Sequence, residues 1–117
     1  MFKLAYMKAP LTWEDFEKID IRIGTIIKAL VFEEAIKPAY RLEIDFGELG
    51  IKRSSAQITT LYTADELPGK QVAAVVNFPE KQIANMKSQC LVLGVVDGKD
   101  VTLLTPDKAV PNGLKIG

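Results

Sequence analysis

The chain contains no histidine and a single cysteine, Cys90, among its 117 residues. The lack of histidine removes the side chain that most often acts as a general base or a metal ligand. One cysteine cannot form an internal disulfide, and there is no Cys and His cluster to bind zinc. Cys90 adjoins an apolar run, so we expect a small buried side chain. No glycine-rich phosphate loop precedes a helix. The sequence therefore predicts no catalytic residue, no metal site, no cofactor and no enzyme activity.

Long apolar runs are also missing, and no segment approaches the roughly 20 residues that a membrane span needs. The first eight residues do not resemble a signal peptide. We therefore expect a soluble, cytoplasmic protein without membrane insertion. Fifteen basic and fifteen acidic residues give a net charge of zero, so binding to a polyanion would require a local patch. Residues 51–90, with five bases and three acids, hold the candidate patch, because residues 12–50 carry five bases and nine acids.

Most of the chain reads as short strands of one domain. The strand-like segments are 20–32, 40–46, 51–58, 72–76, 91–96 and 101–104. A capping box at 63–66 predicts a short helical turn between the third and fourth of them. Strands with so little helix indicate a small sandwich or barrel, and this inserted helix favours an all-β, five-stranded Greek-key barrel, the OB-fold. Gly24, inside the long first strand, predicts a bend, a bulge or a close backbone approach.

The two ends of the chain flank this barrel. We expect an N-terminal extension at 1–11, the barrel domain at 12–105 and a C-terminal segment at 106–117. Residues 12–19 predict a short N-terminal helix whose Trp13, Phe16 and Ile19 share one face, and we expect that face to cover one end of the core. The C-terminal segment keeps three apolar residues, which we expect to pack on the barrel or on a second copy in a homodimer. These dimer-interface candidates are Val110, Leu114 and Ile116.

The segment 77–88, between two apolar strands, is predicted to be a binding loop. Its basic and amide side chains suit RNA, and the RNA-binding candidates are Lys52, Arg53, Asn77, Lys81, Lys87 and Ser88. Lys81 and Lys87 are expected to project from one turn, whereas Lys52 and Arg53 should point to opposite faces of a strand. The segment also holds apolar candidates for binding an unfolded client protein, namely Phe78, Ile83 and Met86. Alternatively, these three side chains pack beneath the loop.

Several motifs resemble, in order and spacing, the tRNA-binding-domain family of OB-folds. They are DIRIGTI at 20–26, SSAQIT at 54–59, GKQV at 69–72, VVNFP at 75–79, KS at 87–88, LVLG at 91–94, Pro106 and PNG at 111–113. The SSAQI segment and the overall length are most similar to the stand-alone, export-related chaperones of that family. Members tend to have glycine where this chain has Asn85, and because asparagine tolerates a left-handed backbone, we expect the turn to survive there. Glu80, beside Lys81, should weaken phosphate binding.

The resemblance implies a homodimer whose N- and C-terminal segments seal the side of the barrel. It implies binding of tRNA or structured RNA on the barrel face around 77–88, with contacts from Asn77, Lys81, Lys87 and Ser88. It also implies a chaperone that holds unfolded precursor proteins for the secretion machinery, without ATP. The sequence leaves both functions open. RNA binding should weaken steeply with salt, whereas binding of apolar clients should be nearly insensitive to salt.

Overall fold

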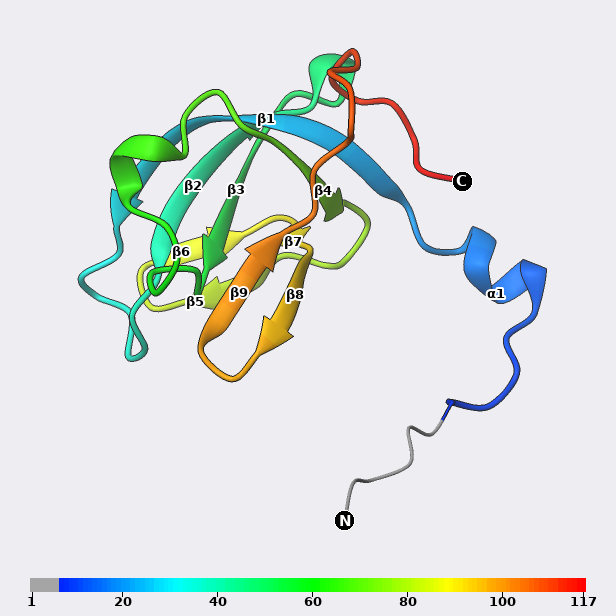
Figure 1. The fold of residues 1–117 in the computed structure, drawn as a ribbon, viewed down its shortest axis with the longest axis horizontal. Coiled ribbons are helices and arrows are strands. Elements are labelled where there is room, and N and C mark those ends of the chain that lie inside the picture. Colours follow the sequence, from blue (N-terminus) through cyan, green and yellow to red (C-terminus); the bar gives the residue numbers. More distant parts are fainter. Residues whose placement is uncertain (1–6) are drawn as a thin grey trace.

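The computed structural model describes residues 7–117, which form a small β-barrel (Figure 1). Five strands form one antiparallel sheet in the order β3-β2-β1-β4-β7. They are β1 (Ile21–Val31), β2 (Tyr40–Asp45), β3 (Ile51–Ala56), β4 (Gln71–Val75) and β7 (Leu91–Val92). The remaining strands form two separate two-stranded ribbons. One ribbon pairs β5 (Lys81–Ile83) with β6 (Met86–Ser88), and the other pairs β8 (Gly94–Asp97) with β9 (Asp100–Leu103). The helical elements are α1 (Trp13–Glu17) and the 3₁₀ turns η1 (Gly47–Leu49) and η2 (Ala64–Glu66). The predicted OB-fold-like barrel, with a helical turn between the third and fourth strands, is confirmed.

The first strand curves around the barrel and pairs with β2 along one part and with β4 along another. Its pairing with β2 is interrupted by an irregularity between Ile26 and Lys28. At Gly24 a Cβ atom would lie 2.6 Å from Cγ2 of Ile44 and 2.7 Å from the ring of Phe46. The neighbours of this glycine are core side chains rather than another backbone, so the predicted close backbone approach is wrong, although the position does have no space for a side chain.

The core forms inside the barrel because strand alternation turns one set of apolar side chains inward. In β2, Tyr40, Leu42 and Ile44 are buried while the intervening residues are partly exposed. The side chains packed most deeply are Phe46, Ile26, Leu42, Ile44, Leu67, Val72 and the polar Ser54. Cys90 is buried in the same cluster, which confirms its prediction as a small core side chain.

The C-terminal segment runs along the first strand. The Ile23 N–H donates to the Leu114 carbonyl at 3.0 Å, and the Ile116 N–H donates to the Ile21 carbonyl at 2.9 Å. Gly113 has a φ of +91°, and a Cβ atom there would lie 2.5 Å from the Phe46 carbonyl oxygen. Because that position needs glycine for both its φ and its space, it fixes the path of the segment onto β1.

Helix α1 projects away from the barrel beyond the start of β1 (Figure 1), and none of its residues is buried. Trp13 is 84% exposed, and Ile19 is also exposed. The prediction that this face covers one end of the core is therefore wrong. Buried side chains such as Ile44 and Phe46 already fill the interior, and α1 lies beyond the start of β1, away from that interior. None of the helices between residues 7 and 117 has the length and hydropathy of a membrane span.

Candidate functional site

The predicted binding loop contains a small hairpin, because β5 and β6 pair within it. Strands of three residues are too short to produce a readable alternation, so the sequence pattern did not reveal them. The hairpin turns at Ala84 and Asn85, and Ala84 has a φ of +49°. The turn does survive without glycine, but the expectation that Asn85 takes the left-handed conformation is wrong. Alanine holds this position at a steric cost.

The register of the hairpin separates its two lysines. Lys81 lies opposite Ser88, whereas Lys87 lies opposite Gln82 on the adjacent rung. Neighbouring rungs point to opposite faces of a two-stranded ribbon. The prediction that Lys81 and Lys87 project together from one turn is therefore wrong, and at most one of them contributes to any single flat surface.

The apolar residues of this segment have different environments. Met86 is buried against Phe32 and Ala39, with the half-buried Ile83 packed beside it. Met86 and Ile83 therefore pack beneath the loop, as the alternative prediction had it. Because Met86 is buried, it is not part of a client-binding surface. Phe78 is 57% exposed, so it is the member of the predicted client-binding set that is available to a partner. Its binding role stays a prediction.

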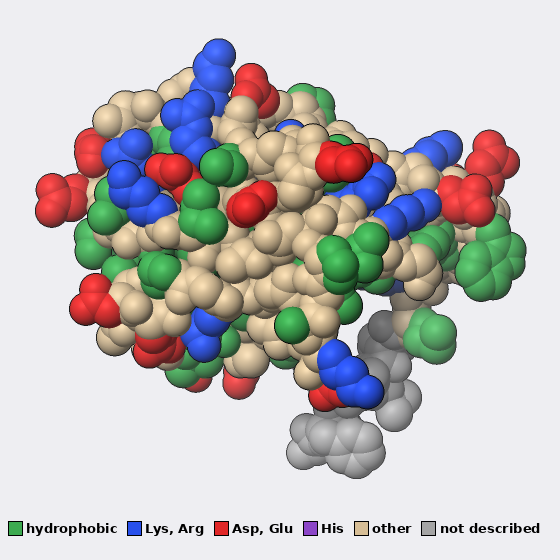
Figure 2. Space-filling model, turned by 90° about the horizontal axis from the view of Figure 1, so that it is seen from above, with side chains coloured by type: hydrophobic (Ala, Val, Ile, Leu, Met, Phe, Trp, Pro, Cys, Tyr) green, Lys and Arg blue, Asp and Glu red, His purple; other side chains and the backbone are tan. Residues whose placement is uncertain are grey.

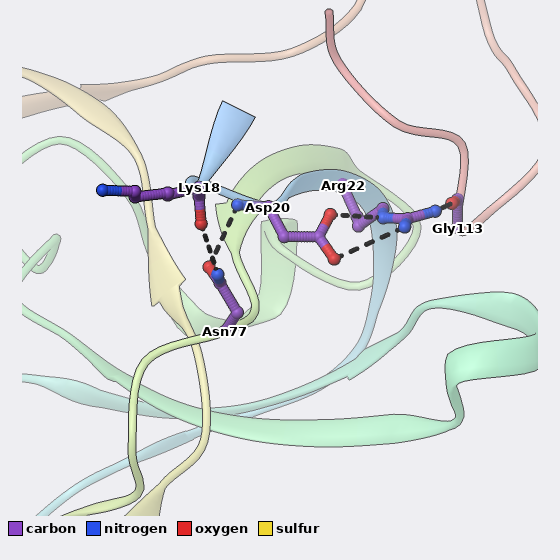
Figure 3. A network of polar contacts seen from close by, with 5 residues as sticks. All are labelled: Lys18, Asp20, Arg22, Asn77 and Gly113. Atoms are coloured by element: carbon purple, nitrogen blue, oxygen red, sulfur yellow. Dashed lines mark hydrogen bonds and ion pairs between the residues drawn. The ribbon is translucent and has the colours of Figure 1, made fainter. Parts of the chain in front are cut away.

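Asn77 lies at a junction of four segments (Figure 3). Its Nδ2 donates to the Lys18 carbonyl at 2.7 Å, and its Oδ1 accepts from the Asp20 N–H at 3.0 Å. The Asp20 carboxylate accepts from Nε of Arg22 at 2.6 Å, and Nη1 of Arg22 donates to the Gly113 carbonyl at 3.0 Å. The Asn77 side chain therefore connects the end of α1 to the start of β1. This structural role leaves Asn77 a weaker candidate for RNA contact.

A row of charged side chains crosses the outer face of β1, β2 and β3. Lys28 lies opposite Glu43, which lies opposite Arg53, and the Lys28 Nζ is 3.9 Å from a Glu43 carboxylate oxygen. In the neighbouring row, Arg41 lies over the Phe32 ring at 5.5 Å. We call Lys28, Arg41, Glu43 and Arg53 the basic face. The face borders the hairpin, because these residues and Met86 line one small cavity of about 60 Å³.

Sequence reasoning identified Arg53 but missed Lys28 and Arg41. The alternation of residues 40–46 already placed Arg41 on an exposed strand face. Only the strand register, however, brings it near Arg53 and Lys28. Lys52 is half-buried on the other side of β3, as alternation predicts. Figure 2 shows basic and acidic side chains interspersed over the surface seen from above, without a continuous basic patch.

Two other polar residues near the hairpin make contacts within the chain. Glu80 accepts a hydrogen bond from Nε2 of Gln89 at 2.9 Å, and Ser88 Oγ donates to the Cys90 carbonyl at 3.3 Å. Among the residues between 7 and 117, no group of three or more acidic or cysteine side chains is arranged to hold a metal ion. The binding potential of this region therefore lies in its basic and apolar side chains.

Comparison with known proteins shows two kinds of similarity. The model of the family described as "Putative tRNA binding domain" matches residues 21–115. The structure is similar to the crystal structure of the chaperone CsaA from Bacillus anthracis, with a TM-score of 0.90 and 55% identity over 93% of this chain and 100% of that one. For the CsaA chaperone protein from Picrophilus torridus, the TM-score is 0.85 and the identity 56%, over 92% of this chain and 100% of that one.

Methionine–tRNA ligases match over a small part of their length. The ligases of Methanococcoides burtonii and Pyrococcus horikoshii are 35% and 36% identical to this chain over 104 residues. The match covers 88% and 89% of this chain but only 15% and 14% of the ligases. The similarity is therefore to one domain of those enzymes.

Proposed function

Because the chain belongs to the tRNA-binding-domain family and is CsaA-like, we propose that it is a holding chaperone for unfolded secretory precursor proteins, acting in the cytoplasm without ATP. The family is a binding domain rather than a catalytic one. The similarity to two CsaA chaperones runs the whole length of those chains, whereas the similarity to the ligases covers one domain. The proposal therefore follows the chaperone relatives.

The observation that supports the proposal most strongly is the number of large apolar side chains on the outside of a well-packed barrel. Ile36 and Phe78 are exposed, and Val96 is 72% exposed. Exposed apolar surface on a folded domain marks interaction sites for partners. Aromatic and branched side chains of this kind can contact apolar segments of many sequences, which is what a holding chaperone requires.

We further propose a homodimer in which α1 of each copy packs against the other copy. A cavity of about 330 Å³ on the barrel is lined by Ile23, Val110, Leu114 and Ile116, among other residues. The exposed Trp13 on the projecting helix is an apolar side chain that such a cavity could accommodate. A two-fold dimer would repeat this contact and present two client surfaces, which raises avidity. Light scattering that gives a monomer mass would contradict the dimer.

The chaperone proposal is tested by the aggregation of a chemically unfolded precursor after dilution. An equal amount of the chain should suppress light scattering without nucleotide. Phe78→Ser should weaken suppression, because it removes exposed apolar surface without disturbing the core. Lys70→Ser, at a lysine beyond the other end of β4 from Phe78, leaves the exposed apolar surface intact, so it is a control and should behave like the parent. Suppression that requires ATP would overturn the proposal.

A second candidate function, tRNA binding, is favoured by the basic face. Arg41, Arg53 and Lys28 lie on one sheet surface, where guanidinium groups can contact phosphates in pairs. Glu43 lies among them and offsets part of that charge. We therefore expect tRNA binding to be modest in affinity and strongly weakened by salt.

A further inference from the structure

Asn112 and Gly113 form an Asn-Gly pair where the C-terminal segment meets β1. In such a pair the glycine nitrogen can attack the side-chain amide carbon of the asparagine, because glycine has no side chain to hinder the approach. The nitrogen loses its proton to solvent, a new C–N bond closes a cyclic imide, and the amide nitrogen takes up a proton and leaves as ammonia. Water then opens the imide at either carbonyl, which gives aspartate or isoaspartate. Water is the only co-reactant, so the fold determines when this reaction can occur.

The attacking nitrogen is engaged in the folded chain. The Gly113 N–H donates to the Ile23 carbonyl at 2.7 Å, so removal of its proton would break a short hydrogen bond. The Asn112 carbonyl of the same peptide group lies against Gly47, where a Cβ atom would be 2.5 Å from the carbonyl oxygen. The peptide group that takes part in ring closure is therefore held on both sides.

The side-chain amide of Asn112 is held as well. Its Oδ1 accepts from the Thr25 hydroxyl at 2.7 Å and from Nε2 of Gln71 at 3.1 Å. The Gln71 side chain also donates to the Val110 carbonyl at 2.6 Å and accepts from the Val110 N–H at 3.0 Å. Residues of β1 and β4 therefore fix both the amide and the chain that leads to it.

We propose that Asn112-Gly113 is a spontaneous deamidation site that is protected while the C-terminal segment is docked on β1. The reaction then proceeds from an open state, in which the segment has left the barrel and both reacting groups are free. Chain ends open locally at a much lower free-energy cost than the whole domain unfolds. The inference stands on this geometry and does not depend on the proposed chaperone function.

The isoaspartate product would make the opening permanent. In isoaspartate the main chain runs through the former side chain, so the β-carbon adds one atom to the backbone. The Leu114 carbonyl and the Ile116 N–H, which bond to Ile23 and Ile21, would then no longer face their partners. The aspartate product keeps the ordinary backbone and an acceptor oxygen, so it should still dock. The site therefore converts a reversible undocking into a one-way change in part of the molecules.

The first test compares deamidation in the folded full chain with deamidation in the same chain unfolded by guanidinium chloride at neutral pH. Peptide mapping by mass spectrometry follows the change from amide to acid at each asparagine. Asn112 should react at least about tenfold more slowly in the folded chain than in the unfolded chain. In the unfolded chain it should also react faster than Asn85, whose neighbour Met86 carries a side chain. Equal rates at Asn112 in the two states would overturn the inference.

The second test removes one hydrogen bond to the amide. Thr25→Val deletes the hydroxyl that donates to Asn112 Oδ1. It should speed deamidation of the folded chain by about two- to tenfold, the factor by which one lost hydrogen bond favours opening. Thr102→Val is the matched control at an exposed position of β9, and it should leave the rate unchanged. Both variants should react like the parent when unfolded.

The same test excludes the opposite role for these donors. Hydrogen bonds to Oδ1 could activate the amide carbon by stabilising the oxyanion that forms as the ring closes. Thr25→Val would then slow the reaction of the folded chain, and that result would overturn the inference. Circular dichroism would check that both variants fold, and the comparison of folded with unfolded parent does not depend on either variant.

The third test examines the product. The parent is deamidated in guanidinium chloride, refolded, and separated by chromatography into its aspartate and isoaspartate forms. Hydrogen exchange of the Ile23 and Ile116 amides should be faster in the isoaspartate form than in the parent, whereas Asn112→Asp should match the parent. The Ile26 amide, which donates to the Lys70 carbonyl within the barrel, is the control and should stay protected. Full protection of Ile116 in the isoaspartate form would contradict the one-way change.

Discussion

The Asn77 side chain accepts a hydrogen bond from the backbone of Asp20, 57 positions earlier, at 3.0 Å. The same amide donates to the Lys18 carbonyl at 2.7 Å, so one side chain bridges the junction between α1 and β1. This contact sets the direction in which the exposed helix leaves the barrel. It connects the segment that follows β4 to the projecting helix.

Replacing Asn77 with alanine should therefore loosen the helix more than the barrel. Two exposed hydrogen bonds are lost, and we expect the free energy of unfolding to fall by about 1 kcal/mol. Trp13 is the chain's single tryptophan, so its fluorescence anisotropy decay should report faster local motion. Asn85→Ala is the matched control, because that amide makes only a 3.5 Å contact with Glu34. Unchanged anisotropy in Asn77→Ala would contradict the bridging role.

The backbone at Ala84 gives a second prediction. Its φ of +49° is unfavourable for alanine and acceptable for glycine. Ala84→Gly should therefore raise the free energy of unfolding by about 0.5–1 kcal/mol, measured by urea unfolding. Asn85→Gly should give no such gain, since Asn85 does not have a positive φ. The reverse ranking of the two variants would show that the left-handed residue is Asn85.

Cys90 gives a pH-dependent prediction. Burial raises the pKa of its thiol to about 11, although a hydrogen bond with Ser54 and the nearby Lys52 oppose the shift. The unfolded chain ionises this thiol from about pH 8.5, whereas the folded chain keeps it protonated. The buried Cys90 thiol therefore adds its full contribution to the free energy of unfolding below that pH. This contribution is lost as the pH rises toward 11, because the unfolded chain releases the thiol proton first.

Urea unfolding at pH 7 and pH 10 tests this account of Cys90. The parent should lose more stability between the two pH values than Cys90→Ala does. Labelling of the folded parent by a thiol reagent at neutral pH should be slow and should accelerate on unfolding. Fast labelling of the folded chain would indicate an exposed or activated thiol.

The strand register determines which basic residues should matter for RNA. Arg41→Ala combined with Arg53→Ala should weaken tRNA binding and reduce the salt slope by about 1.5 units, because two phosphate contacts are lost. Lys81→Ala combined with Lys87→Ala should have a smaller effect, since these side chains point to opposite faces of their ribbon. Filter-binding titrations at several salt concentrations compare the two. A larger effect from the lysine pair would place the RNA site on the hairpin.

The strands were predictable because they carry repeated local signals. Residues 40–45 alternate cleanly between buried and partly exposed positions, and Gly24 marked a strand position without space for a side chain. The hairpin at 81–88 was not predictable, because its two strands are too short for a pattern. Its register, which separates Lys81 from Lys87, is a property of pairing rather than of composition.

The position of Trp13 and the basic face depend on long-range contacts that local patterns do not encode. An apolar helical face normally predicts burial. Helix α1 nevertheless leaves the barrel at Lys18, whose carbonyl accepts a hydrogen bond from the Asn77 side chain. Arg41 and Lys28 are 13 positions apart in sequence and become neighbours of Arg53 only through the pairing of three strands. The candidate client-binding residue Phe78, by contrast, was visible from the sequence.

The central claim is that the chain holds unfolded proteins through apolar contacts, and it is tested most directly by parallel binding titrations. A chemically unfolded precursor and bulk tRNA are each titrated with the full chain between about 50 and 200 mM salt. We predict that affinity for the precursor is nearly unchanged, since apolar contacts do not depend on counterion release. Affinity for tRNA should fall steeply over the same range. Precursor binding that is lost with salt in parallel with tRNA binding, or that is absent throughout, would contradict the account.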